Sequence, residues 1–177
     1  MQRWLIWLLL TSLIMIVPAF ATASAAVDKS LAAAVAIPNA HVPLPGLLTG
    51  GQPTASQLEQ AQVAGVQTVI SLRTPGESDF DEAATVKKLG MTYINIPVAG
   101  AAGVTPDNAR RLDAALGKAA GPVLLHCSSG NRVGALMALR AVLIQGRSVE
   151  EGLQLGRSAG LTRLEPKVRE VLDRESD

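Results

Sequence analysis

The chain contains one cysteine, Cys127, among its 177 residues. No disulfide can form within the chain, so an apolar core must hold the fold together without covalent cross-links. A lone thiol is a liability in an oxidising compartment, and it is therefore either buried and inert or retained for its chemistry. The neighbours of Cys127 in the sequence favour the second interpretation, as shown below.

A strong charge of either sign is also lacking. The 16 lysines and arginines nearly balance the 15 aspartates and glutamates, which leaves a formal net charge of +1. A nearly neutral chain gives no electrostatic reason to expect nucleic acid or an acidic membrane surface as a partner. With 48% apolar and 18% charged residues, the chain has the composition of an ordinary globular protein, and one domain is expected.

The N-terminal segment has the parts of a secretory signal peptide. Met1-Gln2-Arg3 is a short basic start, and residues 4–17 are almost wholly apolar. Small residues follow in the pattern that a signal peptidase cleaves. The alternative is an uncleaved anchor, but the apolar run is short for a membrane span of about 20 residues. The sequence therefore predicts a signal peptide over residues 1–25, cleaved near Ala23 or Ala25, and a periplasmic protein without stable membrane insertion.

The rest of the chain divides into an extension and one folded domain. Residues 26–46 are rich in alanine and proline, show no clear period, and are interpreted as an N-terminal extension. From Leu47 onward, apolar runs of strand length alternate with segments of helical period, which is typical of an α/β layer fold. Residues 47–177 are therefore predicted to form a three-layer α/β domain. A short, mostly parallel sheet would be flanked by helices, with a helical C-terminal tail.

The expected elements follow from apolar periodicity and from helix-capping residues. Three capping boxes predict helix starts, because a Ser or Thr is followed three residues later by Glu or Gln. These boxes pair Thr54 with Gln57, Ser148 with Glu151, and Thr162 with Glu165. Strands are expected at residues 47–49, 66–72, 91–97 and 122–126, and helices at 54–64, 81–89, 105–119 and 133–145.

The run His126-Cys127-Ser128-Ser129-Gly130-Asn131-Arg132 lies between an apolar strand and an apolar helix. In this order, the loop directs backbone N–H groups toward the group that Cys127 attacks. These donors and the positive end of the helix dipole form an anion site and stabilise a thiolate. The alternative is a buried cysteine that happens to precede an arginine. The order of strand, cysteine, glycine, arginine and helix favours a catalytic nucleophile.

The other residues of this loop suit an oxyanion. Gly130 permits a backbone turn that a side chain would forbid, and Ser128 and Ser129 are small enough to leave the pocket open. Arg132 presents a planar fork of donors that fits phosphate, sulfate or thiosulfonate groups. Cys127 and Arg132 are therefore the predicted catalytic pair. The predicted oxyanion-binding loop consists of Ser128, Ser129, Gly130 and Asn131.

The loop, preceded by Val123-Leu124-Leu125, resembles the signature of tyrosine and dual-specificity phosphatases and of rhodanese sulfurtransferases. The runs Gly51-Gln52-Pro53, Val69-Ile70-Ser71-Leu72-Arg73 and Ile96-Pro97-Val98 resemble more narrowly the phosphatase-like domain of the beta-lactamase hydrolase-like proteins. This resemblance covers about residues 47–146. It implies a fold like that of the dual-specificity phosphatases.

One departure from the phosphatase pattern favours sulfur chemistry. Tyrosine phosphatases have five residues between cysteine and arginine, whereas four lie between Cys127 and Arg132, as in a rhodanese loop. A loop shorter by one residue makes a tighter ring of N–H groups. Such a ring suits a persulfide on Cys127 better than a phosphoryl group with three equatorial oxygens.

A second departure concerns the carboxylic acid that protonates the leaving alcohol in tyrosine phosphatases. Residues 97–103, where related phosphatases often carry this acid, contain none. The remaining candidates are Asp79, Asp81 and Asp107. Each of them is explained more simply as a helix cap or a solvated residue.

Two further residues near the loop have open roles. Arg73, at the end of a predicted core strand, either reaches the pocket rim or pairs with a carboxylate such as Glu77. His126 is interpreted as a residue that orders the loop, with a role as general base as the alternative. A thiolate that the helix already stabilises does not require a base.

Sulfur transfer is the favoured prediction. Cys127 would attack the outer sulfur of a donor such as thiosulfate, and the S–S bond of the donor would break to release sulfite and leave a Cys127 persulfide. A thiol or cyanide would then accept the sulfur. The alternative keeps the nucleophile and hydrolyses phosphomonoesters through a phosphocysteine. A third hypothesis is a non-catalytic module that binds oxyanions. No metal or other cofactor is expected, since the two histidines and one cysteine do not form a zinc pattern.

Overall fold

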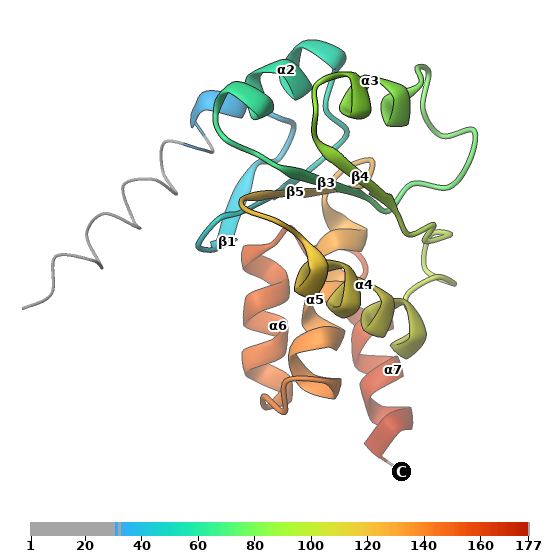
Figure 1. The fold of residues 1–177 in the computed structure, drawn as a ribbon. Helices are drawn as coiled ribbons and strands as arrows, with labels where there is room; N and C mark the ends of the chain where they lie inside the picture. Colours follow the sequence, from blue (N-terminus) through green and yellow to red (C-terminus); the bar gives the residue numbers. More distant parts are fainter. Residues whose placement is uncertain (1–30, 32, 177) are drawn as a thin grey trace, which may run out of the picture.

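The computed structural model describes residue 31 and residues 33–176. A five-stranded sheet of order β1-β2-β5-β3-β4 forms its centre. Helices α2 and α3 cover one face of the sheet, and α4, α5, α6 and α7 lie on the other face (Figure 1). The predicted three-layer α/β class with a mostly parallel sheet is confirmed.

The strands are β1 (His41–Leu44), β2 (Leu47–Gly50), β3 (Thr68–Ser71), β4 (Thr92–Asn95) and β5 (Val123–His126). The helices are α2 (Ala55–Val63), α3 (Glu82–Lys88), α4 (Pro106–Lys118), α5 (Asn131–Leu143), α6 (Val149–Ser158) and α7 (Glu165–Ser176).

The central strand β5 fixes where the site lies. It pairs in parallel with both β2 and β3, so that His126 is level with Gly50 on one side and Ser71 on the other. The three strands therefore end at the same edge of the sheet. In an open parallel sheet, ligands bind beyond the carboxyl ends of the strands. The loops that follow Gly50, Ser71 and His126 meet at this edge.

The core is divided by the sheet into two apolar clusters. Along β5, Val123, Leu125 and the following Cys127 face the cluster under α4, α5, α6 and α7, whereas Leu124 faces the cluster under α2 and α3. This alternation follows from the period of two in a strand. Helix α5 is buried on nearly every side, because α4, α6, α7 and the sheet all pack against it. The helix that carries Arg132 is thus rigidly enclosed.

The capping residues explain most helix starts. Thr54 and Ser148 form the predicted capping boxes with Gln57 and Glu151. The predicted box at Thr162 is wrong, because α7 begins at Glu165, whose N–H donates to the backbone oxygen of Thr162 at 3.2 Å. Here the residues before α7 are drawn into a turn that contacts α5, as described below.

The described part of the predicted extension packs against the domain. Residues His41–Leu44 form β1, which runs antiparallel to β2, and Leu31, Val35 and Ile37 are buried in the second apolar cluster. The predicted signal peptide, residues 1–25, lies outside the described residues. Within the described part of the chain, no helix combines the length and the apolar character that crossing a membrane requires.

Candidate active site

Cys127 lies directly after β5, and its side chain is almost fully buried, with 1% exposed. The backbone N–H of Gly130 donates to its sulfur at 3.2 Å. Gly130 adopts φ 90°, a left-handed conformation that other residues rarely tolerate, and is the N-cap of α5. This turn starts α5 at Asn131, two residues before the predicted start. The loop therefore directs a peptide N–H at the sulfur.

Arg132 lies in the first turn of α5, and three oxygens hold its guanidinium beside the loop. One terminal nitrogen, Nη1, donates to the backbone oxygens of Val98 at 2.7 Å and Leu72 at 3.3 Å. The other, Nη2, donates to the hydroxyl of Ser128 at 3.1 Å. The side chain is only 10% exposed. Arg132 is thus fixed against the loop that carries Cys127.

Glu77, in the loop between β3 and α3, completes this arrangement. Its two carboxylate oxygens accept from Nη1 of Arg132 at 2.9 Å and from Nη2 at 2.6 Å. The hydrogen bonds from Arg132 are the main reason that the pKa of Glu77 lies far below its usual range, and the hydroxyl and N–H of Thr74 lower it further. Glu77 is consequently ionised at neutral pH and cannot donate a proton there.

The carboxylate also acts on the guanidinium. The hydrogen bonds that Arg132 donates to Glu77 raise the pKa of Arg132, and an electrostatic contribution from nearby Cys127 adds to this increase. Glu77 occupies the two terminal nitrogens, and no oxygen of the described residues accepts from Nε of Arg132. A planar guanidinium has a second pair of donors along its Nε edge. The Nε donor of that edge remains for a bound oxyanion, and the Nη2 donor beside it is shared with the hydroxyl of Ser128.

His126 has a structural role. Its ring is fully buried, with Nε2 at 2.9 Å from Oε1 of Glu82 and Nδ1 at 3.4 Å from the backbone oxygen of Cys127. Burial alone would raise the pKa of Glu82, but hydrogen bonding and charge from His126, with a hydrogen bond from Gln52, lower it overall. The His126–Glu82 pair orients the end of β5, and neither side chain hydrogen-bonds to the Cys127 sulfur. This geometry favours the loop-ordering interpretation over a general base.

The accessory residues take different places. Arg73 donates to the side chain of Gln52 at 2.5 Å and lies 3.6 Å from Glu77, so that it pairs with the carboxylate as one hypothesis proposed. Asp81 accepts from the N–H of Ala84 and caps α3. Asp79 is exposed and forms no hydrogen bond or ion pair with the described residues. Neither aspartate contacts the loop of Cys127.

A pocket of about 420 Å³ opens beside the loop. Asn131 lines it, but its side-chain oxygen accepts from the N–H groups of Thr162 at 2.9 Å and Leu164 at 3.3 Å. The Asn131 side chain therefore holds the turn before α7, whereas the sequence predicts a role for Asn131 in oxyanion binding. Sequence reasoning missed both Glu77 as the partner of Arg132 and Arg163 as a pocket residue. The pocket is lined by Glu77, Gly100, Ser129, Asn131, Arg132, Arg163 and Leu164.

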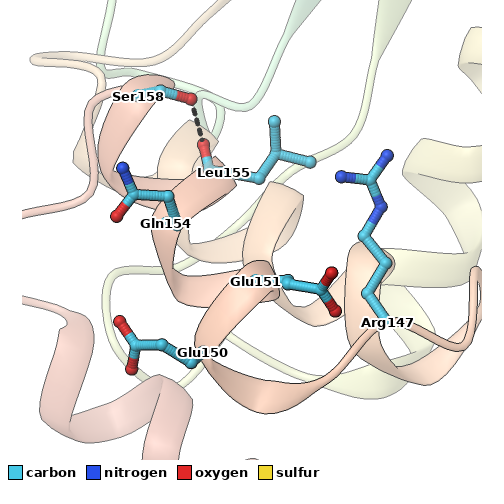
Figure 2. A pocket seen from close by; sticks show the side chains of 6 residues that line it. All are labelled: Arg147, Glu150, Glu151, Gln154, Leu155 and Ser158. Atoms are coloured by element: carbon cyan, nitrogen blue, oxygen red, sulfur yellow. Dashed lines mark hydrogen bonds between the residues drawn. The ribbon is translucent and has the colours of Figure 1, made fainter.

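A second hollow of similar size, about 440 Å³, lies on the outer side of α6. Figure 2 shows its side chains, among them Arg147, Glu150 and Glu151, with the hydroxyl of Ser158 donating to the backbone oxygen of Leu155. Glu151 is already engaged as the capping partner of Ser148. The hollow contains no cysteine, serine–histidine pair or other activated nucleophile. The chemistry of the described residues is therefore concentrated at Cys127.

Comparison with known proteins identifies the family. The profile of the family described as "Beta-lactamase hydrolase-like protein, phosphatase-like domain" matches residues 50–144, which include the strands β3, β4 and β5 and the whole loop from Cys127 to Arg132. The chain belongs to this family. Beta-lactamase hydrolase-like proteins from two strains of Xylella fastidiosa, Temecula1 and 9a5c, are each 31% identical to it over 121 residues. That match covers 64% of this chain but 27% of each relative, so the chain spans about a quarter of their length.

Solved structures show the same fold. A phosphatase candidate from Neisseria meningitidis z2491 aligns with a TM-score of 0.63 and 22% identity over 75% of this chain and 96% of that one. A phosphatase candidate (DUF442) from Shewanella putrefaciens CN-32 aligns with a TM-score of 0.61 and 25% identity, covering 79% and 90%. TpbA of P. aeruginosa, in complex with pTyr, aligns with a TM-score of 0.55 and 23% identity, covering 77% and 83%. The fold is thus that of the tyrosine phosphatases.

Proposed function

We propose that this protein is a cysteine-dependent phosphatase that hydrolyses phosphomonoesters through a phosphocysteine intermediate. One observation carries the proposal: Arg132 is fixed beside the Cys127 loop by Leu72, Val98 and Glu77, and no oxygen of the described residues accepts from its Nε. The family and the fold of the solved relatives support it. They do not support the prediction of sulfur transfer and fit the phosphatase alternative better.

The chemistry follows from these positions. The Cys127 thiolate attacks phosphorus, the bond to the leaving oxygen breaks, and a phosphocysteine forms. The equatorial oxygens gain negative charge that the loop N–H groups and the Arg132 edge stabilise. Water then attacks phosphorus, which releases inorganic phosphate and restores the thiolate. Throughout, Glu77 keeps the guanidinium in one orientation.

The leaving group is the point at which this site differs from an acid-assisted phosphatase. Glu77 is the one carboxylate that lines the described pocket, and it is ionised. A leaving oxygen that must depart without protonation needs to be a weak base. We therefore propose aryl phosphates as the substrate class. The complex of TpbA with pTyr, an aryl phosphate, is in line with this class.

Turnover of an aryl phosphate and an alkyl phosphate by the wild type and by Cys127→Ser tests the proposal. We expect aryl turnover that disappears in Cys127→Ser, with alkyl turnover weaker by about a hundredfold or more because no acid assists it. Asp79→Asn and Asp81→Asn serve as matched controls and should keep the wild-type rate. Aryl turnover that survives in Cys127→Ser would exclude the phosphocysteine route.

Sulfur transfer remains a second candidate because of one observation, the four-residue spacing between Cys127 and Arg132. The N–H of Gly130 at 3.2 Å from the sulfur shows how tightly this short loop closes. Such a loop would hold a persulfide without any proton donor. Incubation with thiosulfate and measurement of the intact mass test this candidate. A gain of one sulfur atom that is absent in Cys127→Ser, together with no aryl phosphate turnover, would replace phosphatase activity with sulfur transfer.

We also propose that the protein acts in the periplasm, on the basis of the basic, apolar and small-residue segments within residues 1–25. The mature N-terminus determined from periplasmic and membrane fractions tests this. A terminus near Ala23 or Ala25 in the periplasmic fraction is expected. A full-length chain retained in the membrane fraction would indicate an uncleaved anchor.

A further inference from the structure

The pocket beside Cys127 contains a second arginine, Arg163, that has no carboxylate partner among the described residues. Its side chain is exposed and lines the same pocket as Arg132. The other lysines and arginines between residues 157 and 176 are all engaged in ion pairs. These are Arg157 with Glu150 and Glu165, Lys167 with Glu170, Arg169 with Glu165, and Arg174 with Glu170. Arg163 differs from each of them in lying toward the pocket without a counter-charge.

The backbone that carries Arg163 is held firmly against the catalytic loop. The residues on both sides of it, Thr162 and Leu164, donate their N–H groups to the side-chain oxygen of Asn131 in the first turn of α5. Earlier in the same turn, Gly160 packs so closely that a Cβ there would lie 3.1 Å from the backbone oxygen of Gly130. The position of Arg163 relative to the catalytic loop is thus fixed by the loop itself.

The charges that line the pocket do not balance. Glu77, Arg132 and Arg163 are its charged residues, and Glu77 is paired with Arg132 at 2.6 Å. The charge of Arg163 is therefore left uncompensated among the residues that line the pocket. An unpaired arginine that lines a pocket is suited to bind a carboxylate or a phosphate oxygen, often with two hydrogen bonds.

We propose that Arg163 is a specificity-determining residue that binds a second anionic group on the substrate. This inference rests on the proposed phosphatase function. While the Cys127 loop and Arg132 hold the phosphoryl group, Arg163 would contact a carboxylate or phosphate carried by the leaving group. Leu164, which lines the pocket beside it, offers an apolar surface for the ring between the two anionic groups. The substrate class is then an aryl phosphate with a further negative charge.

Binding and turnover of matched probes test this inference. Calorimetry compares benzylphosphonate with 4-carboxybenzylphosphonate, and kinetics compare phenyl phosphate with 4-carboxyphenyl phosphate, in the wild type and in Arg163→Gln. We expect the wild type to prefer the carboxylated probe by about tenfold in both assays, as one charge-assisted contact provides. In Arg163→Gln this preference should vanish, while kcat/KM for phenyl phosphate stays unchanged. Arg163→Lys should restore part of it.

Arg169→Gln is the matched control, because it removes an exposed arginine of α7 that does not line the pocket. It should keep the full preference for the carboxylated probes. Turnover without any such preference, or a preference that survives in Arg163→Gln, would overturn the role of Arg163 and leave the phosphatase function standing. The wild type could instead prefer 4-carboxybenzylphosphonate in a way that depends on Arg163 and yet turn over neither phenyl phosphate nor 4-carboxyphenyl phosphate. That result would support the Arg163 subsite and reject the phosphatase function.

Discussion

Replacing Glu77 with glutamine should cost both stability and activity, because it removes the charge that orients Arg132. Glutamine has nearly the same shape, but it offers one acceptor oxygen in place of two and adds N–H donors that face a guanidinium. Two charge-assisted hydrogen bonds, at 2.6 and 2.9 Å, hold the native pair. Glu77 is 27% exposed and Arg132 is 10% exposed, so that the pair is intermediate between a surface pair and a buried one.

The expected size follows from these two limits. Exposed pairs contribute at most about 1 kcal/mol, whereas breaking a buried pair costs about 3 to 5 kcal/mol. We expect Glu77→Gln to lower the free energy of unfolding at neutral pH by about 2 kcal/mol. A guanidinium that is misplaced by an ångström can reduce turnover by about a hundredfold, so kcat/KM for an aryl phosphate should fall between about tenfold and a hundredfold.

The pH dependence gives an independent check on the same pair. The pKa of Glu77 is lower in the folded than in the unfolded state, so the pair stabilises the fold above the unfolded pKa. That stabilisation is lost as the pH falls through the unfolded pKa toward the folded one. The difference in unfolding free energy between wild type and Glu77→Gln should be constant above about pH 6 and should shrink below about pH 4.3.

Urea unfolding followed across this pH range and steady-state kinetics measure these effects. Asp113→Asn is the control, because Asp113 pairs with Arg140 at 2.8 Å away from the pocket. It should cost at most about 1 kcal/mol and leave kcat/KM unchanged. Tighter binding of phosphate or faster turnover in Glu77→Gln would refute the reasoning, since Glu77 would then compete with the substrate instead of positioning Arg132.

Three further changes test the frame of the site. Asn131→Ala leaves two N–H groups before α7 without their acceptor, and urea unfolding should show a loss of about 2 kcal/mol together with loss of any carboxylate preference. Gly134→Ala places a Cβ 2.1 Å from the backbone nitrogen of Leu161 and should lower the free energy of unfolding by more than about 3 kcal/mol. Its control, Gly117→Ala, adds a Cβ in open space and should raise stability by up to about 1 kcal/mol. Equal melting temperatures for the two variants would contradict this packing. Glu82→Ala leaves buried His126 without its partner and should cost about 3 kcal/mol by the same assay, and a neutral result would show that the pair is dispensable.

The sequence alone was enough to single out the candidate nucleophile. The strand, Cys127, Gly130, Arg132 and the helix follow one another without interruption, so local chain geometry alone brings the donors to the sulfur. The capping boxes at Thr54 and Ser148 were predictable for the same reason, because each depends on residues three positions apart. The predicted capping box at Thr162 is wrong because the N–H of Thr162 donates to the side chain of Asn131, which is far away in the sequence.

The spacing within the loop was a poor guide to the reaction. Four residues between Cys127 and Arg132 favoured sulfur transfer, whereas the family and the fold fit a phosphatase better. A count of loop residues describes the size of the ring of N–H groups. It does not say which side of the guanidinium faces the substrate, and this depends on the carboxylate that occupies the other side.

That carboxylate and the second arginine are consequences of the tertiary structure. Glu77 is 55 residues from Arg132 and meets it because the parallel pairing of β3 with β5 brings their following loops to one edge of the sheet. Arg163 reaches the pocket because the turn before α7 binds to Asn131. Several acidic and basic side chains were chemically equivalent candidates for these positions. The sequence determined the candidate nucleophile and its loop, and the packing of distant loops decided which charges surround them.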